Sequence, residues 1–195
     1  MSEVKHSCGL AAVSLPKARH KYPLGGAAFY LYKMLLQQQN RGQLSAGITT
    51  YNEDRQQIID TYKKLGTVNE AFCSHIPVKS RGILKKYSGS KGIGQVRYAT
   101  SGPSDVGAAQ PWERHHGRKW KWFSFAFNGN IANFAQLRNQ LNREHYHLVR
   151  KIDTEIILHH FTKSFVGTRK PKMTDVFGAL AEKFDGAYNI NFINA

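Results

Sequence analysis

The sequence predicts an α+β protein, and three observations support this class. The chain has 195 residues, which is enough for one domain with a sizeable core. Hydrophobic residues make up 41% and charged residues 21% of the chain, as in soluble globular proteins. Apolar runs typical of strands are interspersed with runs in which apolar residues recur at helical spacing.

The first half of the chain predicts strands with one long helix between them. Residues 9–13 form an apolar run that indicates a buried strand. The long helix follows a turn, and its Ala28, Leu31 and Leu35 recur at helical spacing. Two β-rich runs joined by a polar loop predict a hairpin. The predicted strands are 9–13, 46–51, 57–62 and 92–98, and the predicted helices are 27–39 and 68–72.

The second half predicts an aromatic strand, three helices and a last strand. The aromatic strand, residues 122–127, leads directly into Asn128-Gly129, a pair that favours a left-handed turn. Asn133 is expected to cap the helix that follows. The predicted helices are 132–141, 152–165 and 174–184, and a turn with a strand occupies 185–193.

Cysteine content and hydropathy indicate a cytoplasmic protein. The two cysteines, Cys8 and Cys73, are too few for a disulfide framework or a zinc site. The N-terminus lacks the apolar core of a signal peptide, and no stretch approaches the length of a membrane span. We therefore expect a cytoplasmic location and no membrane partner.

The net charge of +15, from 28 Lys and Arg against 13 Asp and Glu, would attract polyanions. Basic residues are concentrated in two stretches, 114–122 and 163–172, and Trp120 and Trp122 are interleaved with the basic residues of the first. Such a segment could bind a nucleic acid strand by stacking and charge. The alternative is a solvated hairpin tip with its aromatic rings turned inward. We favour this alternative because no recognised nucleic-acid motif accompanies the segment.

Cys8 stands at the head of the first predicted strand, seven residues from the start. If residues 1–7 were removed, Cys8 would carry a free α-amine, which titrates near pH ~8. That amine could take the thiol proton and generate a thiolate nucleophile without a histidine. The alternative is that Cys8 is a small core residue.

Three other features suit acyl-transfer chemistry, and each has an ordinary structural alternative. Arg97 precedes a Thr/Ser/Gly turn at 99–103, so it is either a carboxylate clamp or a surface arginine on an edge strand. The Asn128 amide and the Gly129 N–H have the composition of an oxyanion hole, or form a hairpin turn. Asp153 suits a helix N-terminus, or points outward and binds an ammonium.

These features belong to a series of short motifs: Cys8-Gly9, 40–48, 94–102, 109–111, 127–133, 153–155 and 185–188. In this order the motifs resemble the class II glutamine amidotransferase domain, an N-terminal nucleophile hydrolase, over nearly the whole chain. Within the family the resemblance is closest to the amidophosphoribosyltransferases of purine synthesis, because Gln43 follows Arg41-Gly42. Sugar-phosphate aminotransferases usually carry Tyr at that position, and asparagine synthetases usually carry Pro.

The resemblance implies a fold and a catalytic centre. The fold would be the four-layer αββα sandwich of the N-terminal nucleophile hydrolases. Cys8 would attack the glutamine side-chain amide and form a thioester, with its own α-amine as the base. Asn128 and Gly129 would form the oxyanion hole. Residues 1–7 would be a propeptide, and 8–195 a glutaminase domain that is incomplete at its C-terminus.

The resemblance also implies how L-glutamine binds and where its ammonia goes. Arg97 and Thr100 would hold the α-carboxylate, and Asp153 the α-ammonium. Ammonia would pass to a synthase domain or a separate chain, and the full-length protein would be a homo-oligomer. No cofactor or metal is expected in this domain, and any Mg²⁺ would belong to a phosphoribosyltransferase domain outside it.

Three positions depart from the family pattern, which usually has His at each: Asn40, Gln95 and Phe127. These changes leave open a divergent or weakened enzyme. The competing hypothesis is a non-catalytic relative that binds nucleic acid or another polyanion through its basic surface.

Overall fold

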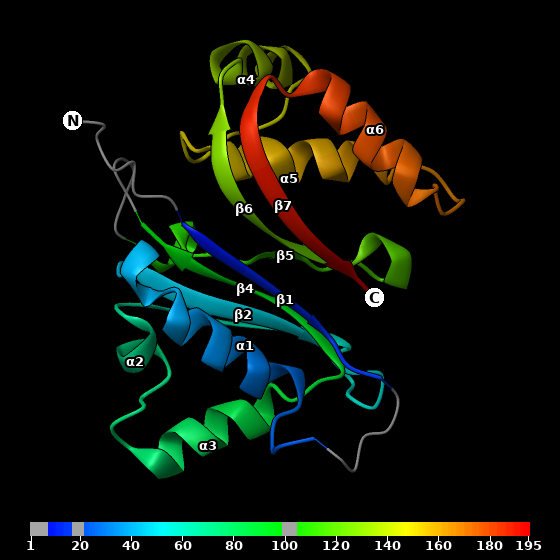
Figure 1. Cartoon of the computed structure of the whole chain (residues 1–195). Coiled ribbons are helices and arrows are strands. Elements are labelled where there is room, and N and C mark those ends of the chain that lie inside the picture. Colours follow the sequence, from blue (N-terminus) through cyan, green and yellow to red (C-terminus); the bar gives the residue numbers. More distant parts are fainter. Residues whose placement is uncertain (1–7, 17–21, 99–104) are drawn as a thin grey trace, which may run out of the picture. The chain divides into compact units, whose positions relative to one another are not determined.

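The structure is a computed structural model that describes residues 8–16, 22–98 and 105–195 (Figure 1). The chain divides into two compact units. The first unit comprises Met1–Asn128 together with Ile190–Ala195, and the second comprises Gly129–Asn189.

The first unit is built on a four-stranded sheet in the order β1-β4-β2-β3. All neighbouring strands in it are antiparallel. The predicted hairpin of β2 and β3 is confirmed, but β3 begins later than expected because Asn52 and Arg55 organise a longer turn through hydrogen bonds. The strands are β1 Gly9–Ser14, β2 Ser45–Tyr51, β3 Ile59–Leu65 and β4 Lys91–Arg97.

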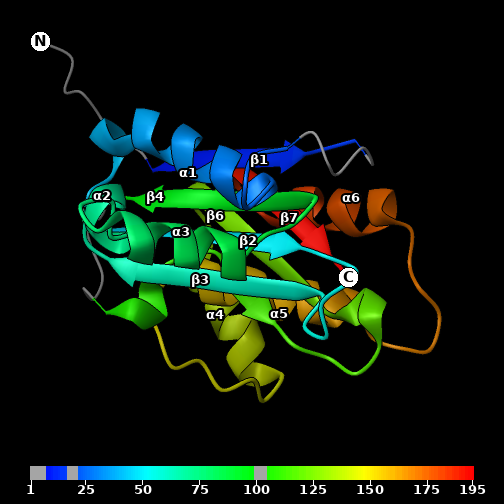
Figure 2. The same cartoon turned by 90° about the horizontal axis from the view of Figure 1, so that it is seen from below.

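Helices α1 and α3 lie on the same side of this sheet, as Figures 1 and 2 show. Leu31 and Leu35 of α1 are fully buried against the sheet, which confirms the helical spacing predicted for this segment. The helix ends before residue 39, where a 3₁₀ turn follows. The helices are α1 Ala27–Gln37, α2 Val68–Ala71 and α3 Pro77–Lys86.

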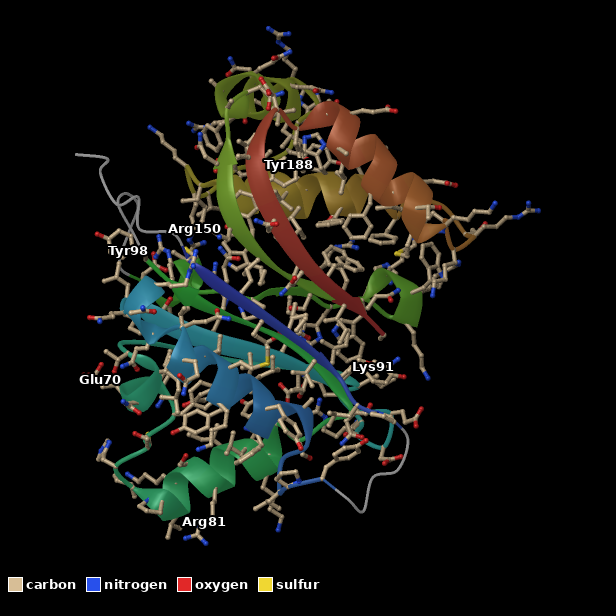
Figure 3. All side chains as sticks on the ribbon, in the orientation of Figure 1. Glu70, Arg81, Lys91, Tyr98, Arg150 and Tyr188 are labelled. Atoms are coloured by element: carbon tan, nitrogen blue, oxygen red, sulfur yellow. The ribbon has the colours of Figure 1, made fainter. Side chains whose placement is uncertain are left out.

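The sequence pattern does not predict α3, because the helix buries little apolar surface. Its buried residues are Ser80 and Leu84 alone. Pro77 begins the helix at the position where a missing N–H costs nothing. Arg81, labelled in Figure 3, projects from its outer side. α2, which was predicted, begins with a capping box between Thr67 and Glu70.

Strand alternation divides the first sheet into two chemically different faces. One face carries Ala46, Ile48 and Val96, which belong to the hydrophobic core under α1. The opposite face carries Gln95 and Arg97, because side chains on β4 alternate with Val96. The face away from α1 is therefore the polar one.

A second, three-stranded sheet has the order β5-β6-β7. β5 pairs with β6 antiparallel, so the basic segment between them connects a hairpin, as we favoured. Trp122 at the end of this segment is half-buried and donates from Nε1 to Glu113 Oε1 at 2.8 Å. The strands are β5 Trp112–Arg114, β6 Phe123–Ile131 and β7 Gly186–Asn194. β5 is not predicted by the sequence.

The three helices of the second unit confirm the predicted ones within two residues at each end: α4 Phe134–Arg143, α5 Asp153–Ser164 and α6 Met173–Lys183. The capping role expected of Asn133 is wrong. Its side chain makes no cap bond; instead it donates to Lys183 O at 2.9 Å and accepts from Asp185 N at 3.2 Å. Asn133 therefore joins α4 to the segment before β7.

Among the described residues, no helix is long and apolar enough to cross a membrane. No group of three or more His, Cys, Asp or Glu side chains among them could hold a metal ion.

Candidate active site

Cys8 lies directly before β1, next to the polar face of the first sheet. The register Gly9↔Val96 places Cys8 opposite Arg97. The thiol is half-buried and donates to the carbonyl of Tyr98 at 3.5 Å. Tyr98 directly follows β4 and is labelled in Figure 3.

The surroundings of the Cys8 thiol act on its ionisation in opposite directions. Burial raises the pKa of the thiol, while the positive charges of Arg97 and Arg41 oppose this rise. A thiol with a raised pKa is mostly protonated at neutral pH, and the thiolate is the nucleophilic form. Cys8 therefore needs a nearby base to act as a nucleophile.

Arg97 is a buried arginine on an interior strand. Its side chain and backbone together are only 8% exposed, and β4 has a neighbour on both sides. The alternative of a surface arginine on an edge strand is therefore wrong. Its carbonyl accepts from Leu44 N at 3.1 Å, which fixes the backbone at this point. Thr100, the second predicted clamp residue, lies outside the described residues.

Asn128 and Gly129 lie inside β6, not in a hairpin turn after it. The strand runs on to Ile131, so the predicted end at residue 127 is wrong. Gly129 has a φ of +147°, and a Cβ atom there would lie 2.3 Å from Ala187 O. Only glycine fits this conformation beside β7. The distant strand β7, not a local turn, therefore explains the glycine.

The backbone of Phe127, just before Asn128, is held by two glutamine side chains. Gln95 Nε2 donates to Phe127 O at 2.7 Å, and Gln110 Oε1 accepts from Phe127 N at 2.6 Å. Both glutamines are buried. The Asn128 side chain that follows is half-exposed and makes no hydrogen bond within the described part of the chain.

The contacts of these two glutamines have no local signal in the sequence. Gln95 departs from the family pattern, and Gln110 belongs to a loop motif. Neither signal indicates a partner 32 or 17 residues away.

Asp153 belongs to the second unit and is the first residue of α5. Its Oδ2 accepts from Ile131 N at 3.2 Å, which ties the end of β6 to the start of α5. Burial raises the pKa of this carboxyl, and the bond from Ile131 opposes the rise. The neighbouring Glu155 is buried and accepts from Val149 N and Arg150 N at 2.8 and 2.6 Å.

The structure thus places Cys8, Arg97 and Asn128 in the first unit, and Gly129 and Asp153 in the second. Cys8 and Arg97 are brought together by strand pairing. Asn128 and Gly129 are adjacent in one strand. The first unit thus contributes a thiol, a buried arginine and an amide, and the second unit contributes a carboxylate.

Comparison with known proteins identifies the class of protein. A family model described as the glutamine amidotransferase domain matches residues 47–169. The chain belongs to this family. The class II resemblance seen in the sequence is thereby confirmed, and the hypothesis of a non-catalytic polyanion-binding relative receives no support.

Its relatives within the family are amidophosphoribosyltransferases. The enzyme of Methanothermobacter thermautotrophicus is 33% identical over 190 residues, covering 97% of this chain and 36% of that protein. The human enzyme is 35% identical over 121 residues, covering 61% of this chain and 22% of that protein. The chain spans about a third of the length of the first curated relatives it matches.

Solved structures share the fold. The glutamine phosphoribosylpyrophosphate amidotransferase of B. subtilis, complexed with ADP and GMP, aligns with a TM-score of 0.72 at 24% identity. A structure titled as the allosteric regulatory enzyme of purine biosynthesis aligns with a TM-score of 0.73 at 25% identity. Each alignment covers 96% of this chain and 35% of the other chain. The predicted fold class, the αββα sandwich of the N-terminal nucleophile hydrolases, is confirmed.

Proposed function

We propose that this chain hydrolyses the side-chain amide of L-glutamine through a thioester on Cys8. The ammonia serves a synthase site that forms phosphoribosylamine in purine synthesis. The half-buried Cys8 thiol lies opposite the buried Arg97, and this pairing supports the proposal because a thiol can act as a nucleophile and a guanidinium can bind a carboxylate. Membership of the glutamine amidotransferase family supports it.

The reaction begins with a proton transfer from the Cys8 thiol to its own α-amine. Removal of residues 1–7 is part of the proposal, since only an N-terminal Cys8 has a free amine. The thiolate attacks the amide carbon, the protonated amine returns the proton to the leaving nitrogen, and ammonia departs. Water then hydrolyses the thioester to release glutamate and restore the thiol.

Polar groups on β4 and β6 are suited to the substrate and the transition state. Arg97 offers a planar fork of donors to the glutamine α-carboxylate, and Thr100 adds a hydroxyl in our proposal. The Asn128 amide and the Gly129 N–H donate to the oxyanion that develops on the attacked carbonyl. One such donor typically lowers the barrier by about 3 kcal/mol.

Asp153 is the proposed partner of the substrate α-ammonium. Ile131 N–H occupies its Oδ2, and no described residue bonds to its other oxygen. The raised pKa of the free carboxyl would fall when an ammonium binds, because an opposite charge favours the ionised form.

The ammonia released by this domain has to reach an acceptor. The proposed ammonia acceptor is a synthase domain or a separate chain, and any Mg²⁺ site belongs to that part. We further propose a cytoplasmic homo-oligomer when the acceptor is present. Glutamine hydrolysis itself uses no metal or cofactor in this scheme.

The test is ammonia release from glutamine by the purified chain, with its intact mass measured in parallel. We expect a mass that begins at Cys8, and we expect Cys8→Ala to abolish ammonia release. Cys73→Ala is the matched control, because Cys73 is the other half-buried free cysteine and lies after α2. Full activity in Cys8→Ala would refute the mechanism.

A further inference from the structure

We propose that Gln95 and Gln110 are positioning residues for the oxyanion hole: together they hold the Phe127 backbone, and so set the place of Asn128. The inference rests on the proposed function, because it assigns a catalytic purpose to the contacts that these glutamines make. All four residues belong to the first unit.

The two glutamines replace a missing strand neighbour. β5 pairs with β6 through Trp112↔Phe125, and continuing this register by two residues would place Gln110 opposite Phe127. β5 begins only at Trp112, so the ladder stops before that pair. Gln110 Oε1 accepts from the Phe127 N–H, and Gln95 Nε2 donates to the Phe127 carbonyl. These two bonds replace the pair of backbone hydrogen bonds that an opposite residue in a neighbouring strand would make.

The loop that carries Gln110 is pinned to the first sheet from two sides. Lys63 Nζ on β3 donates to Ala109 O at 2.7 Å and to Pro111 O at 3.2 Å, on either side of Gln110. Gly47 on β2 admits the Gln110 carbonyl, since a Cβ at Gly47 would lie 2.2 Å from that oxygen. The backbone that carries Gln110, whose Oε1 accepts from the Phe127 N–H, is therefore held in place by β2 and β3.

The Phe127 carbonyl determines which way the Gln95 side-chain amide is oriented. A backbone carbonyl only accepts, so the group that faces Phe127 O must be the NH₂. Gln95 Oε1 is buried and has no hydrogen-bond partner among the described residues. The side chain thus forgoes one hydrogen bond inside the protein while keeping the bond to Phe127.

The contact also joins two of the three departures from the family pattern. Gln95 and Phe127 are both positions where the family usually has His, and the structure puts the Gln95 side chain on the Phe127 backbone. Phe127 takes part through its backbone, so the bond from Gln95 does not require a particular side chain at position 127. An imidazole N–H at position 95 would still be a donor for the same carbonyl.

Small shifts of this backbone would matter because an oxyanion donor acts over a narrow range. Donors must lie about 2.7–3.1 Å from the oxyanion, and a misplacement of about 1 Å can cost on the order of 100-fold in rate. Loss of either glutamine would leave the donor on Asn128 present but poorly placed. The effect would fall on the transition state and not on substrate binding.

The test compares Gln95→Leu, Gln95→His and Gln110→Ala with the parent chain. We expect kcat to fall about 10- to 100-fold in Gln95→Leu and Gln110→Ala, with KM changed less than about threefold. Gln95→His should recover most of the loss. Gln136→Glu, on an exposed side chain of α4, is the control and should behave as the parent.

Hydrogen exchange of the Phe127 amide gives a readout that does not depend on activity. We expect the Phe127 amide to exchange faster in Gln110→Ala than in the parent chain. The rate at which Cys8 is alkylated should be the same in both. A fall in kcat without rescue by Gln95→His, or with unchanged exchange in Gln110→Ala, would overturn the positioning role. If Gln110→Ala does not fold, the Gln95 pair decides. If the mass of the parent chain begins at Cys8 but the chain has no glutaminase activity, the proposed function is overturned. If Phe127 exchange is unchanged in Gln110→Ala, the hold of the glutamines on the Phe127 backbone is overturned, whatever the activity.

Discussion

Gly129→Ala provides a direct test of how tightly β6 and β7 fit together at the proposed oxyanion hole. Two separate costs follow from the structure. The φ of +147° is one that L side chains rarely adopt, and enforcing such a conformation costs about 1–3 kcal/mol. The added Cβ would also lie 2.3 Å from Ala187 O and 2.5 Å from Tyr188 Cα. Overpacking against backbone adds about 1–3 kcal/mol.

Two other glycines separate these costs. Gly167 has a φ of +95° with no atom within 4 Å of a built Cβ, so Gly167→Ala carries the conformational cost alone. Gly178 lies in α6 with open space around it and no unusual φ, so Gly178→Ala carries neither. We expect Gly178→Ala to stabilise the protein by about 0.5–1 kcal/mol.

The assay is urea unfolding of the three variants and the parent, with slopes compared to confirm a common transition. We expect losses in the free energy of unfolding of about 3–5 kcal/mol for Gly129→Ala and about 1–2 kcal/mol for Gly167→Ala. If Gly129→Ala loses no more than Gly167→Ala, the close packing of β7 on Gly129 is refuted.

Two further predictions concern the second unit. Burial, with Lys183 and Lys163 nearby, lowers the pKa of His160 to about 4, so the unfolded chain takes up a proton first as pH falls below about 6.5. Stability should therefore fall by up to roughly 3 kcal/mol between pH 6.5 and pH 4, and His160→Gln should flatten this dependence in pH-dependent unfolding. Asp153→Asn should raise KM for glutamine about 10-fold or more with little loss of stability, because the amide oxygen still accepts from Ile131 N–H. An unchanged KM would remove Asp153 from the substrate site.

Local signals were sufficient where an element has its own pattern. The apolar run of β1, the helical spacing of Leu31 and Leu35 in α1, and the hairpin of β2 and β3 were all predictable. In such segments the spacing of the apolar residues, every second residue in a strand and every third or fourth in a helix, indicates which side chains are buried. The order of short motifs along the chain was likewise sufficient to identify the family, and it is the basis for proposing Cys8 as the nucleophile.

Elements that depend on distant partners were not predictable. β5 has three residues and exists through its pairing with β6. The Asn128-Gly129 pair has the sequence of a turn, yet β6 continues through it because β7 packs against Gly129. A local propensity of a few tenths to one kcal/mol is overridden when a neighbouring strand supplies several hydrogen bonds.

Patterns in the sequence were enough to predict the fold class, the family and the types of residue proposed for its chemistry. The contacts that hold those residues follow from the tertiary structure. Cys8 and Arg97 are 89 positions apart in the numbering and become opposite through the β1–β4 register. Gln95 and Gln110 reach one residue of β6 from two separate segments. Such side-chain contacts leave no local periodicity in the sequence, because they depend on where distant backbones meet.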